Sequence, residues 1–183
     1  KKIAASRARS GLRQRPEIMK THFALFALLC GQSLAQDIVI YGGTPGGIAT
    51  AVSAARMGRE VMLVEYHDHI GGMTTSGLGK SDIENRAMIG GIFKEFVAGV
   101  REHYITKYGP EHEHTKLCQD GYYAEPHVAE KVFEAMIAKE PKITVWKGWR
   151  LKSAHTVENK LMGITGAKEQ DFIPSKELVK QKE

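Results

Sequence analysis

The sequence predicts an α/β protein with a Rossmann-like parallel sheet, flanking helices and a small β-meander. Two short apolar runs, at residues 38–41 and 61–64, have the length and composition of buried parallel strands. A glycine-rich turn and a helical pattern over about residues 48–57 lie between them, and Glu65 directly follows the second run. This order of strand, turn, helix and strand is typical of the βαβ unit.

The glycine-rich turn has the composition of a dinucleotide-binding site. It consists of Gly42, Gly43, Thr44, Pro45, Gly46 and Gly47. A diphosphate must approach the backbone N–H groups at the start of a helix, and a Cβ in the turn would block that approach. Thr44 occupies the second glycine position of the G-x-G-x-x-G pattern, where its hydroxyl can donate to a phosphate. Glu65, about 20 residues further on, can accept hydrogen bonds from a ribose diol.

A second glycine loop, residues 69–79, follows the acid. An NAD-binding domain usually continues from the acid into another helix without such a loop. The loop resembles the second glycine motif of flavoproteins, which wraps the diphosphate and ribityl chain of FAD. Its hydroxyl donors would be Thr74, Thr75 and Ser76. The candidate cofactor-binding residues here are Gly71, Gly72, Met73, Thr74, Gly77 and Gly79.

The two loops together resemble those of FAD-dependent oxidoreductases with the glutathione-reductase-type FAD fold. In a secreted or periplasmic bacterial group, the turn reads GGTPxGI and the second loop reads GGMxxSGLG. Both are present here, at residues 42–48 and 71–79. The resemblance continues through residues 90–92 and 125–133, and it covers roughly residues 37–166.

This resemblance implies FAD as the cofactor and a two-electron reaction at the flavin, with a small-molecule substrate that stays unknown. It also implies that the backbone at Arg150 contacts the adenine. No catalytic residue is assigned, because the family's substrate-holding groups belong to a later domain, before which we expect this chain to be truncated. Two alternatives stay open: an NAD(P)-binding Rossmann module, and a non-catalytic protein that kept the FAD fold.

Charge and metal-ligand patterns argue against other classes of function. The formal net charge is +5, but residues 1–35 carry +6, so the remainder is close to neutral and offers no basic patch for nucleic acid. The H-x-H run at residues 112–114 is expected in a polar loop, residues 111–114, without further ligands, so no metal is predicted. Cys118 would be the single cysteine after leader cleavage, which argues against a dithiol mechanism.

The basic N-terminus has the layout of a secretory signal peptide. It starts at Met19, continues through the apolar residues 23–30 and ends on small residues up to Ala35. We therefore expect a secreted or periplasmic protein with no membrane contact after cleavage, and an upstream extension at residues 1–18. The alternatives are a packed N-terminal helix, a lipid anchor on Cys30 and an organelle transit peptide. The sequence leaves the oligomeric state open.

The remaining elements complete the FAD-binding domain, which we expect over residues 36–166. Apolar periodicity predicts a helix from about 87 to 108, ended by Gly109 and Pro110, and another from Pro126 to about 139. A third strand at 143–146 would give the sheet order third, second, first.

The C-terminal part of the chain is predicted to contain a hairpin and a polar tail. The hairpin covers residues 151–164 and turns near Glu158 and Asn159. Residues 167–183 form the tail, which shows no strand signal and is expected to be disordered.

Overall fold

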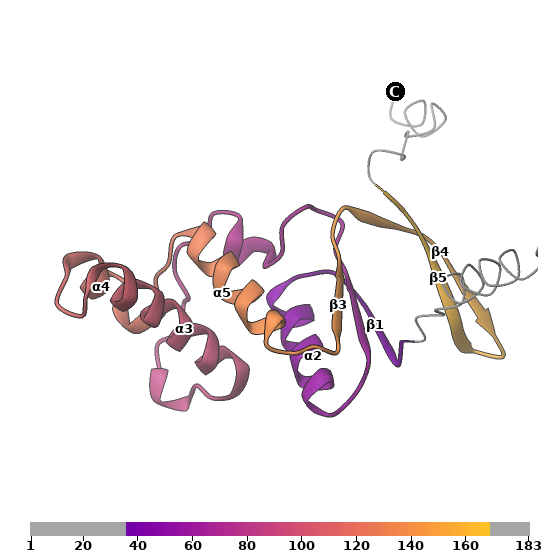
Figure 1. The fold of residues 1–183 in the computed structure, drawn as a ribbon, viewed down its shortest axis with the longest axis horizontal. Helices are drawn as coiled ribbons and strands as arrows, with labels where there is room; N and C mark the ends of the chain where they lie inside the picture. Colours follow the sequence, from indigo (N-terminus) through magenta and orange to yellow (C-terminus); the bar gives the residue numbers. More distant parts are fainter. Residues whose placement is uncertain (1–35, 169–183) are drawn as a thin grey trace, which may run out of the picture. The chain divides into compact units, whose positions relative to one another are not determined.

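The computed structural model describes residues 36–168. The expected upstream extension and signal peptide lie outside the described residues, as do residues 169–183 of the expected tail. The described part is a mixed α/β structure with a three-stranded parallel sheet and a separate antiparallel hairpin (Figure 1). The predicted fold class is therefore confirmed.

Three short strands form the sheet in the order β1-β2-β3. They are β1 (Ile38–Tyr41), β2 (Val61–Val64) and β3 (Ile143–Trp146). The central strand β2 pairs in parallel with both neighbours, and all four of its residues are buried. A strand covered on both faces is uniformly apolar for this reason. The strand bounds and the order of neighbours both agree with the sequence prediction.

Helices connect these strands. The described α-helices are α2 (Pro45–Arg56), α3 (Gly91–Tyr108), α4 (Glu113–Leu117) and α5 (Pro126–Ala138). The described 3-10 helices are η1 (Gly72–Thr75), η2 (Arg86–Met88) and η3 (Gln119–Gly121). Among residues 36–168, no helix is both long enough and apolar enough to cross a membrane.

Three helix starts differ from the prediction. Helix α2 begins about one turn earlier than expected, because Thr44 caps it and Pro45 suits the first helical position. Helix α3 begins later, because the extended Gly90 and the left-handed Gly91, with φ +57°, separate it from η2. The prediction of a loop at residues 111–114 is wrong for residues 113 and 114, because α4 already begins at Glu113.

The hairpin consists of β4 (Trp149–Val157) and β5 (Lys160–Lys168). Its turn lies at Glu158 and Asn159, as predicted, with φ of +48° and +62°. Two left-handed residues in a row are typical of the type I′ hairpin turn. Strand β5 continues to Lys168, so the expectation that residues 167 and 168 belong to a tail without strand structure is wrong. Among the described residues, β4 and β5 form a two-stranded sheet in the place of the predicted β-meander.

The largest part of the core lies between the sheet and the helices. On α3 and α5, the rings of Phe96 and Phe133 stack with centroids 4.4 Å apart. Gly99 lets these helices come close, because a Cβ there would lie 2.8 Å from Cγ1 of Val132. The pairing brings segment 125–133, which the sequence had singled out, beside the sheet region (Figure 1).

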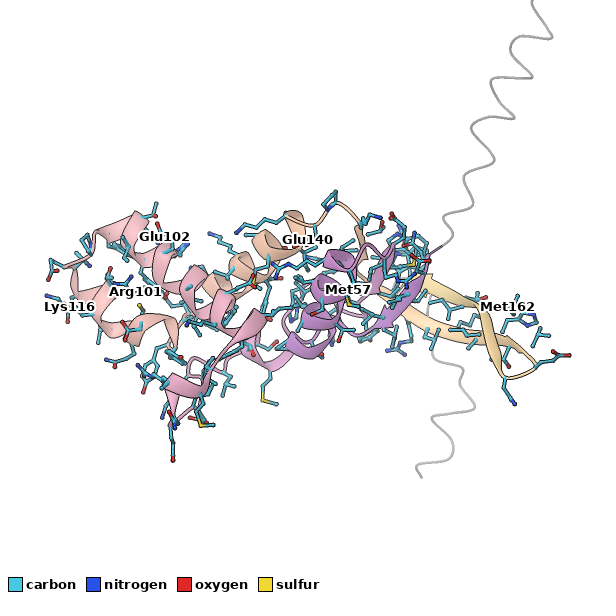
Figure 2. The ribbon with its side chains drawn as sticks, turned by 90° about the horizontal axis from the view of Figure 1, so that it is seen from below. Met57, Arg101, Glu102, Lys116, Glu140 and Met162 are labelled. Atoms are coloured by element: carbon cyan, nitrogen blue, oxygen red, sulfur yellow. The ribbon has the colours of Figure 1, made fainter. Side chains whose placement is uncertain are left out.

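Arg56 at the end of α2 links that helix to α3 and to the segment that follows α5. Its guanidinium lies 2.8 Å from a carboxylate oxygen of Glu95 and 2.7 Å from one of Glu140. Figure 2 shows Met57, the C-cap of α2, and Glu140 on the segment that follows α5. Because these side chains are partly exposed, the ion pairs add less to stability than the apolar core does.

Replacing Tyr104 with phenylalanine should destabilise the chain in a pH-dependent way. The buried Tyr104 hydroxyl donates to the Glu125 carboxylate, and this bond lowers the pKa of Glu125 below its ordinary 4.5. Burial, together with that bond, raises the pKa of Tyr104 to about 12, so the phenol stays protonated.

A carboxyl whose pKa is lowered by folding stabilises the folded state fully at pH values above its pKa in the unfolded chain. This stabilisation is lost as the pH falls through its pKa in the folded chain. Tyr104→Phe should therefore lower the free energy of unfolding by about 1 kcal/mol at pH 7 and by less at pH 3. Urea denaturation at both pH values measures this, with Tyr123→Phe, at a more exposed tyrosine, as the control. An equal loss at both pH values would contradict it.

Candidate functional site

The candidate site lies at the edge of the sheet where all three parallel strands end. Strand β1 ends at Tyr41, β2 at Val64 and β3 at Trp146, and these three residues are partners in the strand register. The loops that follow the strands therefore emerge beside one another. In open α/β sheets, ligands bind outside this carboxyl edge.

The first loop is the glycine turn between β1 and α2. The N–H of Gly42 donates to the carbonyl of Val64 at 2.8 Å, which ties the turn to β2. Gly42 has φ +117°, a conformation that favours glycine. At Gly47, a Cβ would lie only 2.0 Å from the carbonyl oxygen of Gly42. The helix can therefore start this close to the strand end only with glycine at position 47.

The start of α2 is accessible to a ligand. Thr44, Pro45 and Gly46 are exposed, and the N–H of Gly46 lies in the first turn, where a helix provides no internal acceptor. The Thr44 hydroxyl accepts the N–H of Gly47 at 3.2 Å. Its own hydrogen is not used in that bond, so the hydroxyl can still donate to a phosphate oxygen, as the sequence predicted.

Glu65 lies directly after β2, with its side chain turned toward the glycine turn. The residue is only 8% exposed. Its Oε2 accepts the N–H of Gly43 at 2.5 Å, and its Oε1 accepts the N–H of His67 at 2.9 Å. A carboxylate oxygen can accept two hydrogen bonds, so both oxygens keep capacity for a ribose hydroxyl. Sequence reasoning missed that Glu65 also holds the turn in place; its position at a strand end facing a glycine turn was the available signal.

The second glycine loop contacts the first. The N–H of Gly71 donates to the carbonyl of Gly43 at 2.6 Å. Gly71 and Gly72 have φ of +104° and +53°, and a Cβ on Gly72 would lie 3.5 Å from Cα of Thr44. The structure therefore brings the two sequence motifs together, and they border one site.

The hydroxyl groups of the second loop have different roles. Thr75 is buried, and its hydroxyl donates to the carbonyl of Ile70 at 2.7 Å. The expectation that Thr75 provides a donor to a ligand is therefore wrong, because its single hydrogen holds the loop. Ser76 Oγ lies 3.1 Å from His69 Nε2, and Thr74 is half-buried.

Other candidates in the second loop lie at its surface. Met73 is 74% exposed, and Gly77 and Gly79 are exposed as well. The carbonyl of Gly79 accepts the N–H of Ala124 at 3.1 Å, which anchors the end of the loop. These residues border the accessible side of the loop, where ligand contact is sterically possible.

The third loop, after β3, contacts the segment between β2 and the second glycine loop. The N–H groups of Gly148 and Trp149 donate to the carbonyls of His67 and Glu65 at 3.1 and 3.0 Å. Arg150 follows, and its guanidinium lies 4.4 Å from the centre of the Tyr66 ring. The structure thus places Arg150 beside the site, and its adenine contact stays a prediction. Sequence reasoning missed Tyr66, which has no motif signal.

Cys118 and the H-x-H run lie outside this site. Cys118 is buried and donates to the carbonyl of Thr115 at 3.0 Å, which is consistent with the core or loop position expected from the sequence. The rings of His112 and His114 stack with centroids 5.1 Å apart. Across residues 36–168, no three His, Cys, Asp or Glu side chains gather as metal ligands.

Comparison with known proteins identifies the family. Residues 37–175 match the family described as FAD dependent oxidoreductase, and the chain belongs to that family. FAD is its cofactor. The match continues beyond Gly166, where the resemblance was expected to stop. A search of curated proteins found no match.

Several solved structures are similar to this chain in fold. One is THI4 from Thermovibrio ammonificans, at 21% identity and a TM-score of 0.45, with 87% of this chain and 58% of that chain covered. Another is glycine oxidase from Bacillus cereus, at 16% identity and 0.45, with 73% and 53% covered. A third is L-proline dehydrogenase from P. horikoshii, at 15% identity and a TM-score of 0.44, with 72% of this chain and 49% of that chain covered. The chain thus spans about half the length of these structures.

Proposed function

We propose that this chain holds FAD across its two glycine loops and serves a secreted or periplasmic oxidoreductase with the glutathione-reductase-type FAD fold. The reaction would be a two-electron oxidation or reduction of a small molecule, for which bound FAD supplies the electron acceptor or donor. The observation that carries the proposal is the contact between the loops, where Gly71 donates to Gly43 at 2.6 Å beside the exposed start of α2.

The residues of the site suit the parts of FAD. The first turn of α2 offers the Gly46 N–H and the Thr44 hydroxyl to the diphosphate, and the helix dipole favours the negative charge there. Glu65 would bind the ribose through the acceptor capacity left on its oxygens. The backbone of the second loop, from Gly71 onward, would follow the diphosphate and ribityl chain. The backbone at Arg150 would contact the adenine.

Binding measurements on the purified chain test this proposal. The two tryptophans of the chain are Trp146, which ends β3, and Trp149, which begins β4, and their ring centroids lie 5.0 Å apart. Their fluorescence should therefore respond to a dinucleotide at this edge. We expect FAD and ADP to compete for one site, and NAD to bind at least about tenfold more weakly, because NAD lacks the ribityl chain that the second loop would contact.

Replacing Gly72 with valine should weaken FAD binding by about tenfold or more. A β-branched residue is strained at φ +53°, and its Cβ would lie against Thr44 in the first loop. The matched control is Gly58→Val, at another left-handed glycine, with φ +85°, that follows α2 and has open space around its Cβ position. Equal NAD and FAD affinity, unaffected by Gly72→Val, would favour the NAD(P) module. A chain that binds neither would favour the non-catalytic alternative.

A further inference from the structure

Glu130 lies in segment 125–133, which the sequence singled out and to which the cofactor site has so far given no role. It is on α5, and its side chain is 26% exposed. Its Oε1 accepts the N–H of Ile70 at 3.1 Å, across 60 residues of sequence. Glu130 therefore connects α5 to the beginning of the second glycine loop.

The peptide groups at Ile70 and Gly71 determine where the second loop lies. Ile70 is almost fully buried, and its carbonyl accepts the Thr75 hydroxyl at 2.7 Å. The next N–H, that of Gly71, donates to Gly43 of the first loop at 2.6 Å. Glu130 thus accepts the N–H of Ile70, and the next N–H along the chain, that of Gly71, makes the hydrogen bond between the two loops. A shift of Ile70 would move Gly71 and lengthen its bond to Gly43.

The ion pair of Glu130 with Lys147 does not explain its position. The Nζ of Lys147 lies 4.0 Å from Glu130 but 2.7 Å from Glu134, one turn further along α5. Partly exposed ion pairs contribute little, and this lysine already has a closer partner. A bond from a backbone N–H to a charged, partly buried carboxylate contributes more. The contact that distinguishes Glu130 from Glu134 is therefore its bond to Ile70.

We propose that Glu130 is a positioning residue of the FAD site. It holds the second glycine loop against the first, so that the backbone from Gly71 onward is ready to receive the diphosphate and ribityl part of FAD. This inference rests on the proposed function and adds a residue to it. It predicts that Glu130 affects the binding of whole FAD more than the binding of its adenylate half, which the first loop and Glu65 would hold.

Three variants separate this role from a general effect on stability. Glu130→Ala should bind FAD about tenfold more weakly than wild type while its affinity for AMP changes by less than about twofold. Glu130→Gln keeps an amide oxygen that can accept the Ile70 N–H, so it should recover most of the FAD affinity. Glu134→Ala, which removes the closer partner of Lys147 and no loop contact, should match wild type.

The outcomes separate failure of this inference from failure of the proposed function. If wild type does not bind FAD, the proposed function fails. If wild type binds FAD and Glu130→Ala binds it equally well, or loses FAD and AMP affinity in parallel, the positioning role fails. Should Glu130→Ala not fold, hydrogen exchange in wild type decides: we expect the Ile70 amide to be protected by about 100-fold or more, and an unprotected amide would overturn the inference.

Discussion

Replacing Gly47 with alanine should lower the free energy of unfolding by about 3 kcal/mol and abolish FAD binding. The added Cβ would lie 2.0 Å from the carbonyl oxygen of Gly42. Because that oxygen belongs to the backbone, no side-chain rotation relieves the overlap, and α2 must move away from β1. The movement would displace Thr44 and Gly46, whose groups face the proposed diphosphate position.

Gly46→Ala is the matched control for this prediction. It adds the same methyl group one residue earlier in the same turn, where the nearest atom, Oγ1 of Thr44, would be 3.9 Å away. Alanine favours the helix over glycine, so this variant should be as stable as wild type or up to about 1 kcal/mol more stable. Urea denaturation compares the two variants. Equal stabilities would show that the close approach at Gly47 does not constrain the fold.

Replacing Glu65 with alanine should have the second-largest effect, a loss of about 3 kcal/mol in the free energy of unfolding together with loss of FAD binding. The substitution removes the acceptor of two backbone N–H groups, those of Gly43 and His67. Gly43 is buried, and leaving a buried donor without a partner costs about 1–3 kcal/mol, whereas His67 is exposed and its N–H loses less. The proposed ribose contact disappears in the same variant.

The stability and the ADP affinity of Glu65→Gln should lie between those of Glu65→Ala and those of wild type. Its amide keeps one oxygen acceptor, but its NH₂ group must face one of the two N–H donors. Glu60→Ala serves as the control, because Glu60 lies directly before β2 and its side chain is half exposed in an ion pair with Lys142 at 3.1 Å. Chemical denaturation and ADP titration measure stability and binding. Wild-type stability and ADP affinity in Glu65→Ala would contradict both roles.

The sheet could be predicted from the sequence because its strands are short, uninterrupted apolar runs, of which the central one is fully buried and the outer two are mostly half-buried. The apolar runs at 38–41, 61–64 and 143–146 are bounded by glycine, charged or proline-containing segments, and all three bounds are confirmed. The start of α3 could not be predicted in the same way. Ile89 fits the apolar period of the helix, but two glycines that follow it interrupt the backbone. The apolar periodicity of a sequence indicates which side chains face the core, but it does not indicate where the backbone changes direction.

The candidate site could be predicted only as far as its motifs extend. Both glycine loops and Glu65 were visible as local patterns, and the structure places them in contact. The role of Glu130 depends on a contact across 60 residues, and that of Tyr66 on a contact with Arg150 across 84. Such pairs form only once the sheet brings the loops together. The use of the Thr75 hydroxyl depends instead on the backbone conformation of its own loop, which residue types alone do not specify.

The most direct measurement is the change in backbone amide chemical shifts when FAD is added to the isotopically labelled chain. We expect the largest changes at residues 42–47 and 71–79, with smaller ones at Tyr66 and Arg150. ADP should reproduce the changes in the first range and few of those in the second. Changes confined to α3 and α4, or none in either glycine loop at saturating FAD, would contradict the proposal that FAD lies across the two loops.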